Sequence, residues 1–107
     1  MKYLITESQI NKLIFTYLDN QDFIKFEKDN FIYFVNSEGD NYAQIKYDIN
    51  DKWCMINYEL IDEINSFFST DTTTSIDLIT QWFENTLQIE VSGSVAGLSQ
   101  YLSLIHI

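Results

Sequence analysis

The hydrophobic pattern of this 107-residue chain changes its period at Asp22. From there to Asn57 apolar and polar residues largely alternate, which is the pattern of half-buried strands. Three turn signals divide this run: two Asn/Asp pairs, which tolerate positive φ in tight turns, and a longer loop that contains a glycine. The pattern therefore predicts four strands, over Phe23–Lys28, Phe31–Asn36, Tyr42–Ile49 and Lys52–Ile56.

Counting residues across the three turns predicts which strand positions face each other. The first turn places Phe26 opposite Tyr33, and the five-residue loop places Tyr33 opposite Ile45. The last turn places Tyr47 opposite Cys54. One face of the resulting antiparallel meander is nearly all apolar and is expected to form the core: Ile24, Phe26, Phe31, Tyr33, Val35, Ala43, Ile45, Tyr47, Cys54 and Ile56.

Helical spacing flanks the strands on both sides. A capping box at Thr6–Gln9 precedes a helix whose apolar face runs from Ile10 to Leu18. Two more helices are expected after the strands, one with Asn57 as its N-cap and one capped by Thr74. The chain is therefore expected to be an α+β domain, a four-stranded antiparallel meander with one N-terminal and two C-terminal helices.

The end of the domain is expected near residue 91. A short fifth strand at the sheet edge is considered for Gln88–Val91, so that residues 1–91 form a single α+β domain. The small residues that follow predict a flexible C-terminal tail over residues 92–107. Its last six residues, Leu102–Ile107, resemble the start of a translated sequencing adapter, which would make part of the tail non-native. The alternative is an ordinary apolar C-terminal segment that packs on the core.

Composition argues against most catalytic chemistries. The chain has one histidine, His106, one cysteine, Cys54, and no arginine or proline. A Cys–His pair, a His–carboxylate pair and a zinc site each lack a partner. Cys54 falls on the expected core face, where a small buried hydrophobe is the simpler interpretation than a nucleophile. We therefore predict no catalytic, cofactor-binding or metal-ligating residue, and no cofactor, and we expect that the chain is not an enzyme.

A calcium loop is the closest match to a metal motif. Asp48, Asn50 and Glu59 fall at the first, third and twelfth positions of an EF-hand loop. Lys52 and Trp53 then fall at the fifth position, where a ligand is needed, and at the sixth, where glycine makes the turn. The motif is therefore rejected.

Net charge limits the partners. Sixteen acids against six lysines give a formal charge of −10. Since nucleic-acid affinity comes largely from basic groups, direct nucleic-acid binding is not expected. No apolar stretch approaches the roughly 20 residues of a membrane helix, and the first residues do not form a secretory signal, so we expect a cytoplasmic protein without membrane contact. The charge either serves solubility alone or favours a basic partner.

The opening of the chain carries one resemblance. Ile5-Thr6-Glu7-Ser8-Gln9 resembles the Ile-Thr-Glu-x-Gln segment near the start of small uncharacterised proteins of environmental phages. The resemblance covers less than a tenth of the chain and implies no activity. Together with the charge, it raises the alternative of a phage-type nucleic-acid mimic that inhibits a basic host protein.

The second sheet face is the candidate interaction surface. The predicted register gathers large apolar side chains there: Phe23, Ile32, Phe34, Tyr42, Trp53 and Met55, among Lys25, Glu27, Gln44 and Lys46. An exposed apolar cluster of that size is typical of an interface, unless one of the helices covers it. Residues expected to contact a partner are Phe34, Tyr42, Trp53 and Met55.

The function expected first is a small acidic, non-enzymatic protein-interaction module. Its partner is either another protein or a second copy of the chain. The mimic or inhibitor is the first alternative, and a small enzyme that uses a pair of carboxylates is the second.

Overall fold

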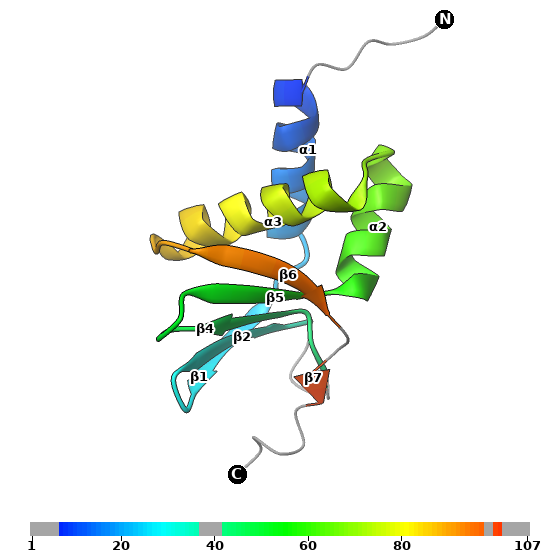
Figure 1. Cartoon of the computed structure of the whole chain (residues 1–107). Coiled ribbons are helices and arrows are strands. Elements are labelled where there is room, and N and C mark those ends of the chain that lie inside the picture. Colours follow the sequence, from blue (N-terminus) through cyan, green and yellow to red (C-terminus); the bar gives the residue numbers. More distant parts are fainter. Residues whose placement is uncertain (1–6, 37–41, 98–99, 102–107) are drawn as a thin grey trace, which may run out of the picture.

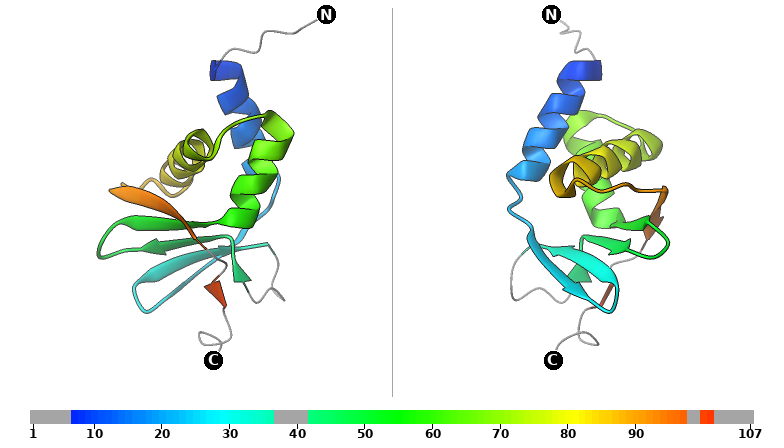
Figure 2. Two further views of the ribbon diagram at one scale, coloured as in Figure 1. Left: turned by 45° about the vertical axis from the view of Figure 1, so that its right-hand side comes forward. Right: turned by 90° about the vertical axis from the view of Figure 1, so that its left-hand side faces the viewer.

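The computed structural model describes residues 7–36, 42–97 and 100–101. In this part of the chain three helices lie on one side of a five-stranded mixed sheet (Figure 1), and two further views show the same arrangement (Figure 2). The predicted α+β class is confirmed. The elements are α1 (Glu7–Asp19), β1 (Ile24–Lys28), β2 (Phe31–Val35), β3 (Tyr42–Ala43), β4 (Ile45–Asp48), β5 (Trp53–Asn57), α2 (Tyr58–Phe68), α3 (Thr72–Leu87), β6 (Gly93–Gly97) and β7 (Gln100–Tyr101).

The sheet has the order β1-β2-β4-β5-β6, and its first four strands are antiparallel neighbours, as the turn signals predict. Asp29 and Asn30 both adopt positive φ, as expected for the tight turn between β1 and β2. The short strands β3 and β7 pair with each other in a separate two-stranded sheet.

Strand β6 corrects the prediction for the C-terminal segment. The sequence predicts a flexible tail from residue 92 on, but Gly93–Gly97 pairs in parallel with β5, Trp53 opposite Gly93. Parallel neighbours need a long crossover, and α2 and α3 form it between the end of β5 and the start of β6. The prediction fails because small residues are typical of linkers, whereas this segment becomes a strand through pairing with the distant β5. The adapter-like residues 102–107 lie outside the described part of the chain.

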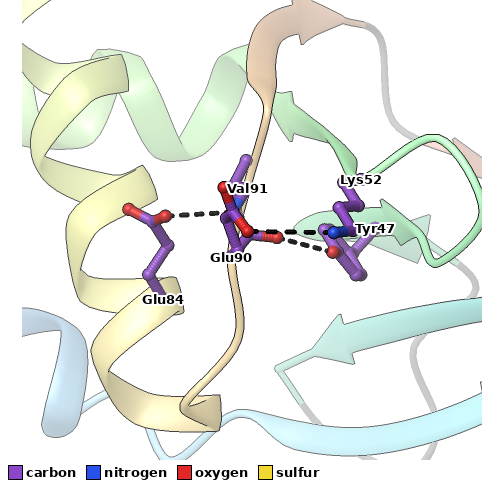
Figure 3. A network of polar contacts seen from close by, with 5 residues as sticks. All are labelled: Tyr47, Lys52, Glu84, Glu90 and Val91. Atoms are coloured by element: carbon purple, nitrogen blue, oxygen red, sulfur yellow. Dashed lines mark hydrogen bonds and ion pairs between the residues drawn. The ribbon is translucent and has the colours of Figure 1, made fainter.

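The sheet does have the fifth strand that the sequence allows, but this strand is β6 and not residues 88–91, which are held by irregular hydrogen bonds. The Glu84 carboxylate accepts from the Val91 N–H at 2.9 Å, and the Tyr47 hydroxyl donates to the Glu90 carbonyl at 2.8 Å (Figure 3). The Glu90 carboxylate also lies 3.8 Å from the Lys52 ammonium. These contacts link the segment between α3 and β6 to the helix on one side and to the sheet on the other.

A β-bulge at Gln44 shifts the register that the sequence predicts. Ile45 pairs with Phe34, and the Gln44 N–H also donates to the Phe34 carbonyl, at 2.7 Å. Two residues of one strand therefore lie opposite one residue of the other, which displaces the pairing by one position. The loop length predicts that Tyr33 lies opposite Ile45. In the structure Tyr33 lies opposite Lys46.

The bulge divides the predicted apolar face into two clusters on opposite sides of the sheet. The part on β1 and β2 packs with Ala43, which lies before the bulge, on the side away from the helices. That cluster comprises Ile24, Phe26, Phe31, Tyr33, Val35 and Ala43. On the helix side, strand residues after the bulge join Ile32 and Phe34 in the main core: Ile45, Tyr47, Cys54 and Ile56.

Asn57 connects the bulge to the start of α2. Its side chain accepts from the Glu59 N–H at 3.0 Å, as the predicted N-cap should, and its amide donates to the Gln44 side chain at 3.4 Å. The N-cap of α3 is Asp71 and not Thr74, whose N–H instead donates to the Asp71 carboxylate at 2.7 Å. The predicted cap Thr6 lies outside the described residues.

Phe83 of α3 is the centre of the main core. Its ring is fully buried and lies 5.1 Å from the Phe34 ring and 5.4 Å from the Tyr47 ring, measured between centroids. Aromatic pairs at such distances contribute beyond the area that they bury. Phe83 therefore joins the helix layer to strands β2 and β4 of the sheet.

Replacing Phe83 with alanine should lower the free energy of unfolding by about 3–5 kcal/mol, because a large buried ring leaves a cavity. The matched control is Phe67→Ala on α2, whose ring is 69% exposed and should contribute less than about 1 kcal/mol. Urea unfolding of the two variants measures both effects. Equal midpoints would contradict this assignment of the core.

Candidate interaction surface

Among the residues that the structure describes, none covers a region over β4, β5 and β6 on the side of the sheet away from the helices. We define the open face as six residues: Phe31, Lys46, Asp48, Trp53, Met55 and Val95. Two of them are strongly exposed, Trp53 at 48% and Val95 at 46%. The fold therefore leaves about half of the Trp53 side chain exposed to solvent.

Two glycines in β6 shape this face. Gly93 is the ladder partner of Trp53, and a Cβ there would come within 2.7 Å of the indole. Gly97 is likewise so close to Met55 that a Cβ would come within 2.9 Å of its thioether. Both side chains therefore lie across β6 and cover positions where the neighbouring strand has no side chain.

A shallow hollow of about 170 Å³ lies among the open-face residues. The Lys46 ammonium is 4.3 Å from the centroid of the Phe31 ring, a cation–π contact. Asp48 has a role in the β4–β5 turn, where its carboxylate accepts from the Asn50 and Asp51 N–H groups. The hollow thus combines apolar walls with one cation and one anion, a composition common at protein interfaces.

The structure does not bring the four predicted contact residues together on one surface. Trp53 and Met55 lie together on the open face. Phe34 is buried on the other side, where it stacks on Phe23 and contacts Trp82, so its expected place on the surface is wrong. Only the backbone of Tyr42 is described, in β3.

The sequence pattern assigns two members of the open face elsewhere. It predicts that Phe31 lies in the core with Ile45 and Tyr47, because the bulge that sends these two residues to the other side of the sheet has no signal in the sequence. It places Val95 in the tail. The one local feature that distinguishes Val95 is that it is the only large apolar residue between Gly93 and Gly97.

The open face is poor in acids although the chain is strongly acidic. Strand positions on that side of the sheet include Lys28 and Lys46, and Asp48 is the one acid among the described strand residues there. Acids dominate the helices instead. The sheet side is therefore the part of the described surface where another acidic molecule meets the least repulsion.

Cys54 faces the core and is shielded from solvent. Burial and the nearby Glu84 carboxylate raise the pKa of its thiol to about 12, although a hydrogen bond with Ser94 acts in the opposite direction. A nucleophilic cysteine needs a lowered pKa and access to substrate, and Cys54 has neither. The side chain belongs to the packing between β5, β6 and α3.

A second, polar hollow of about 400 Å³ lies between α1 and the start of α3 and is lined by two acids, Asp71 and Asp77. The pKa of Asp71 is lowered by its hydrogen bonds with Thr74 at the helix N-terminus. A general acid at neutral pH needs a raised pKa, so Asp71 is suited to capping and not to proton transfer. This hollow therefore gives no specific support for a carboxylate enzyme.

Within the described ranges, no group of three or more His, Cys, Asp or Glu side chains is placed to hold a metal ion. No helix there is both long and apolar enough to cross a membrane. No family model, curated protein or solved structure matches the chain.

The two tryptophans allow a direct test of the open face. In Trp82→Phe the remaining indole is the exposed Trp53, and in Trp53→Phe it is the buried Trp82, which donates to Asp19 at 2.8 Å. At low protein concentration acrylamide should quench Trp53 several-fold more strongly than Trp82, because quenching requires contact. Similar quenching constants would contradict the exposure described above.

The raised pKa of the Cys54 thiol predicts that the stability of the fold depends on pH. This pKa is about 12 in the fold and about 8.5 in an unfolded chain, so above about pH 8.5 only the unfolded state releases this proton. The free energy of unfolding should therefore fall with pH, by at most about 1.4 kcal/mol per unit. Chemical unfolding from pH 8 to about 10 should show a flatter dependence for Cys54→Ala than for the wild type. Parallel curves would contradict the prediction.

Proposed function

We propose that this chain is a small acidic protein-interaction module that pairs with a second copy of itself through the open face. The observation that carries the proposal is the half-exposed Trp53, next to Val95 and above a small hollow, on the acid-poor side of an acidic molecule. Tryptophan is enriched among the residues that dominate binding energy at interfaces.

The open face is complementary to itself under a two-fold axis. Lys46 and Asp48 are two residues apart on β4, so both point to the same side, about 7 Å apart. An axis that lies between two facing sheets and crosses β4 at Tyr47 brings each Lys46 opposite Asp48 of the other copy. Trp53 pairs with Asp48 and Met55 with Lys46 in the ladder, so the same axis brings Trp53 opposite Met55 of the other copy.

Both contacts are of a favourable kind. Sulfur–aromatic contacts contribute about 0.3–1.5 kcal/mol each, and the two-fold axis makes every contact twice. The facing charges suppress wrong arrangements more than they add affinity, because like charges brought together cost several kcal/mol. Closed two-fold dimers are the commonest soluble homo-oligomers.

The experiment uses the two charges as a matched pair. Lys46→Asp places two acids opposite each other at both contacts, and Asp48→Lys places two lysines there. Each variant alone should therefore be monomeric, whereas an equimolar mixture should form a heterodimer in which every contact is again Lys–Asp. Sedimentation equilibrium measures this as a mass near twice the 12.6 kDa of one chain.

Three controls separate association from folding. Circular dichroism checks that both charge variants remain folded, since Asp48 also accepts turn hydrogen bonds. Trp53→Ser should dissociate the wild-type dimer, whereas Phe67→Ser on α2 should leave it intact. A wild type that is monomeric up to about 1 mM, or a mixture that stays monomeric, overturns the proposal.

A further inference from the structure

A second exposed apolar group lies on the helix layer, on the other side of the sheet from the open face (Figure 1). Phe67 on α2 is 69% exposed and Leu13 on α1 is 49% exposed. Tyr17 lies one helical turn after Leu13, and its ring centroid is 5.5 Å from that of Phe67. We define the helix patch as Leu13, Tyr17, Phe67 and the acids Glu59 and Glu63.

The acids of the helix patch have a fixed spacing from its apolar part. Glu59, Glu63 and Phe67 are four residues apart along α2, so they form one stripe along the helix, about 12 Å long. All three are exposed. The Glu63 carboxylate accepts from the Tyr17 hydroxyl at 2.8 Å, which fixes its position next to the rings. Burial, together with this hydrogen bond and the Glu63 charge, raises the pKa of Tyr17 to about 12.

Charge in this part of the molecule is mostly negative. After Lys52 the sequence contains seven acids and no lysine or arginine. These residues build α2 and α3, so in the described structure α1 provides the only lysine of the three helices, Lys12. The helix patch therefore lies in a negative field that repels a second copy of the chain and attracts a cation-rich partner.

We propose that the helix patch binds a basic amphipathic helix of another protein. An apolar side chain of that helix packs on Phe67 and Tyr17, and lysines or arginines one and two turns away meet Glu63 and Glu59. The partner is thus expected to carry one apolar and two basic residues at spacings of three or four. Amphipathic helices commonly dock on apolar surfaces in this way.

The test uses three fluorescein-labelled peptides of equal length. The first is an amphipathic helix with leucines on one face and lysines on the flanks. The second has glutamates in place of the lysines, and the third has the composition of the first in an order that breaks the apolar face. Fluorescence anisotropy should detect saturable binding of the first peptide only, weakening as salt rises.

Variants then assign the binding to the helix patch. Phe67→Ser should weaken binding of the first peptide at least tenfold. Glu59→Gln with Glu63→Gln should weaken it and reduce its salt dependence, and the amide oxygen introduced by Glu63→Gln can still accept from the Tyr17 hydroxyl. The matched control, Asp77→Asn with Glu90→Gln, removes two charges elsewhere and should leave binding unchanged.

Trp53→Ser should also bind the first peptide as the wild type does, so this inference does not depend on pairing through the open face. Binding of the scrambled peptide with equal affinity would mean attraction by charge alone and would overturn the proposal. So would equal losses in the Glu59/Glu63 and Asp77/Glu90 variants, no loss in Phe67→Ser, or no binding of the first peptide at low salt.

Discussion

The β-bulge at Gln44 is the constraint on which both the core and the open face depend. A side chain in a strand alternates between faces, so one extra residue reverses the face of everything that follows. Here it lets Ile45 and Tyr47 join Phe34 under the helices and sends Lys46 and Asp48 to the other side. The same residue is hydrogen-bonded to Asn57 at the start of α2, so the bulge also lies next to the connection between sheet and helix layer.

Much of the fold could be predicted because local patterns and turn chemistry agree. The tight turn at Asp29 and Asn30 fixes the β1–β2 register, and the pairing of Tyr47 with Cys54 is also as predicted. Asn57 caps α2 as expected. In each case a short-range interaction determines the outcome, and no distant part of the chain has to be known.

The sequence predictions are wrong where an interaction between distant parts of the chain determines the structure. A bulge has no requirement for a special residue type, so Gln44 gives no signal, and the sequence pattern places Phe34 on the wrong side of the sheet as a result. Nothing local marks β6 as a strand either, because it depends on pairing with β5 after a two-helix crossover. Half of the six open-face residues could still be predicted: the pattern assigns Trp53, Met55 and Lys46 to the second sheet face, but it assigns Phe31 and Val95 elsewhere.

The glycines of β6 have a consequence for how such a surface can vary. Any substitution at Gly93 or Gly97 adds at least a methyl group beneath Trp53 or Met55, at distances that force these side chains to move. The exposed shape of β5 is therefore controlled by the strand beside it. A lineage could therefore remodel the open face, and with it the proposed pairing, without altering Trp53 or Met55 themselves. Conversely, an unchanged tryptophan at position 53 would not by itself show that the surface had been preserved.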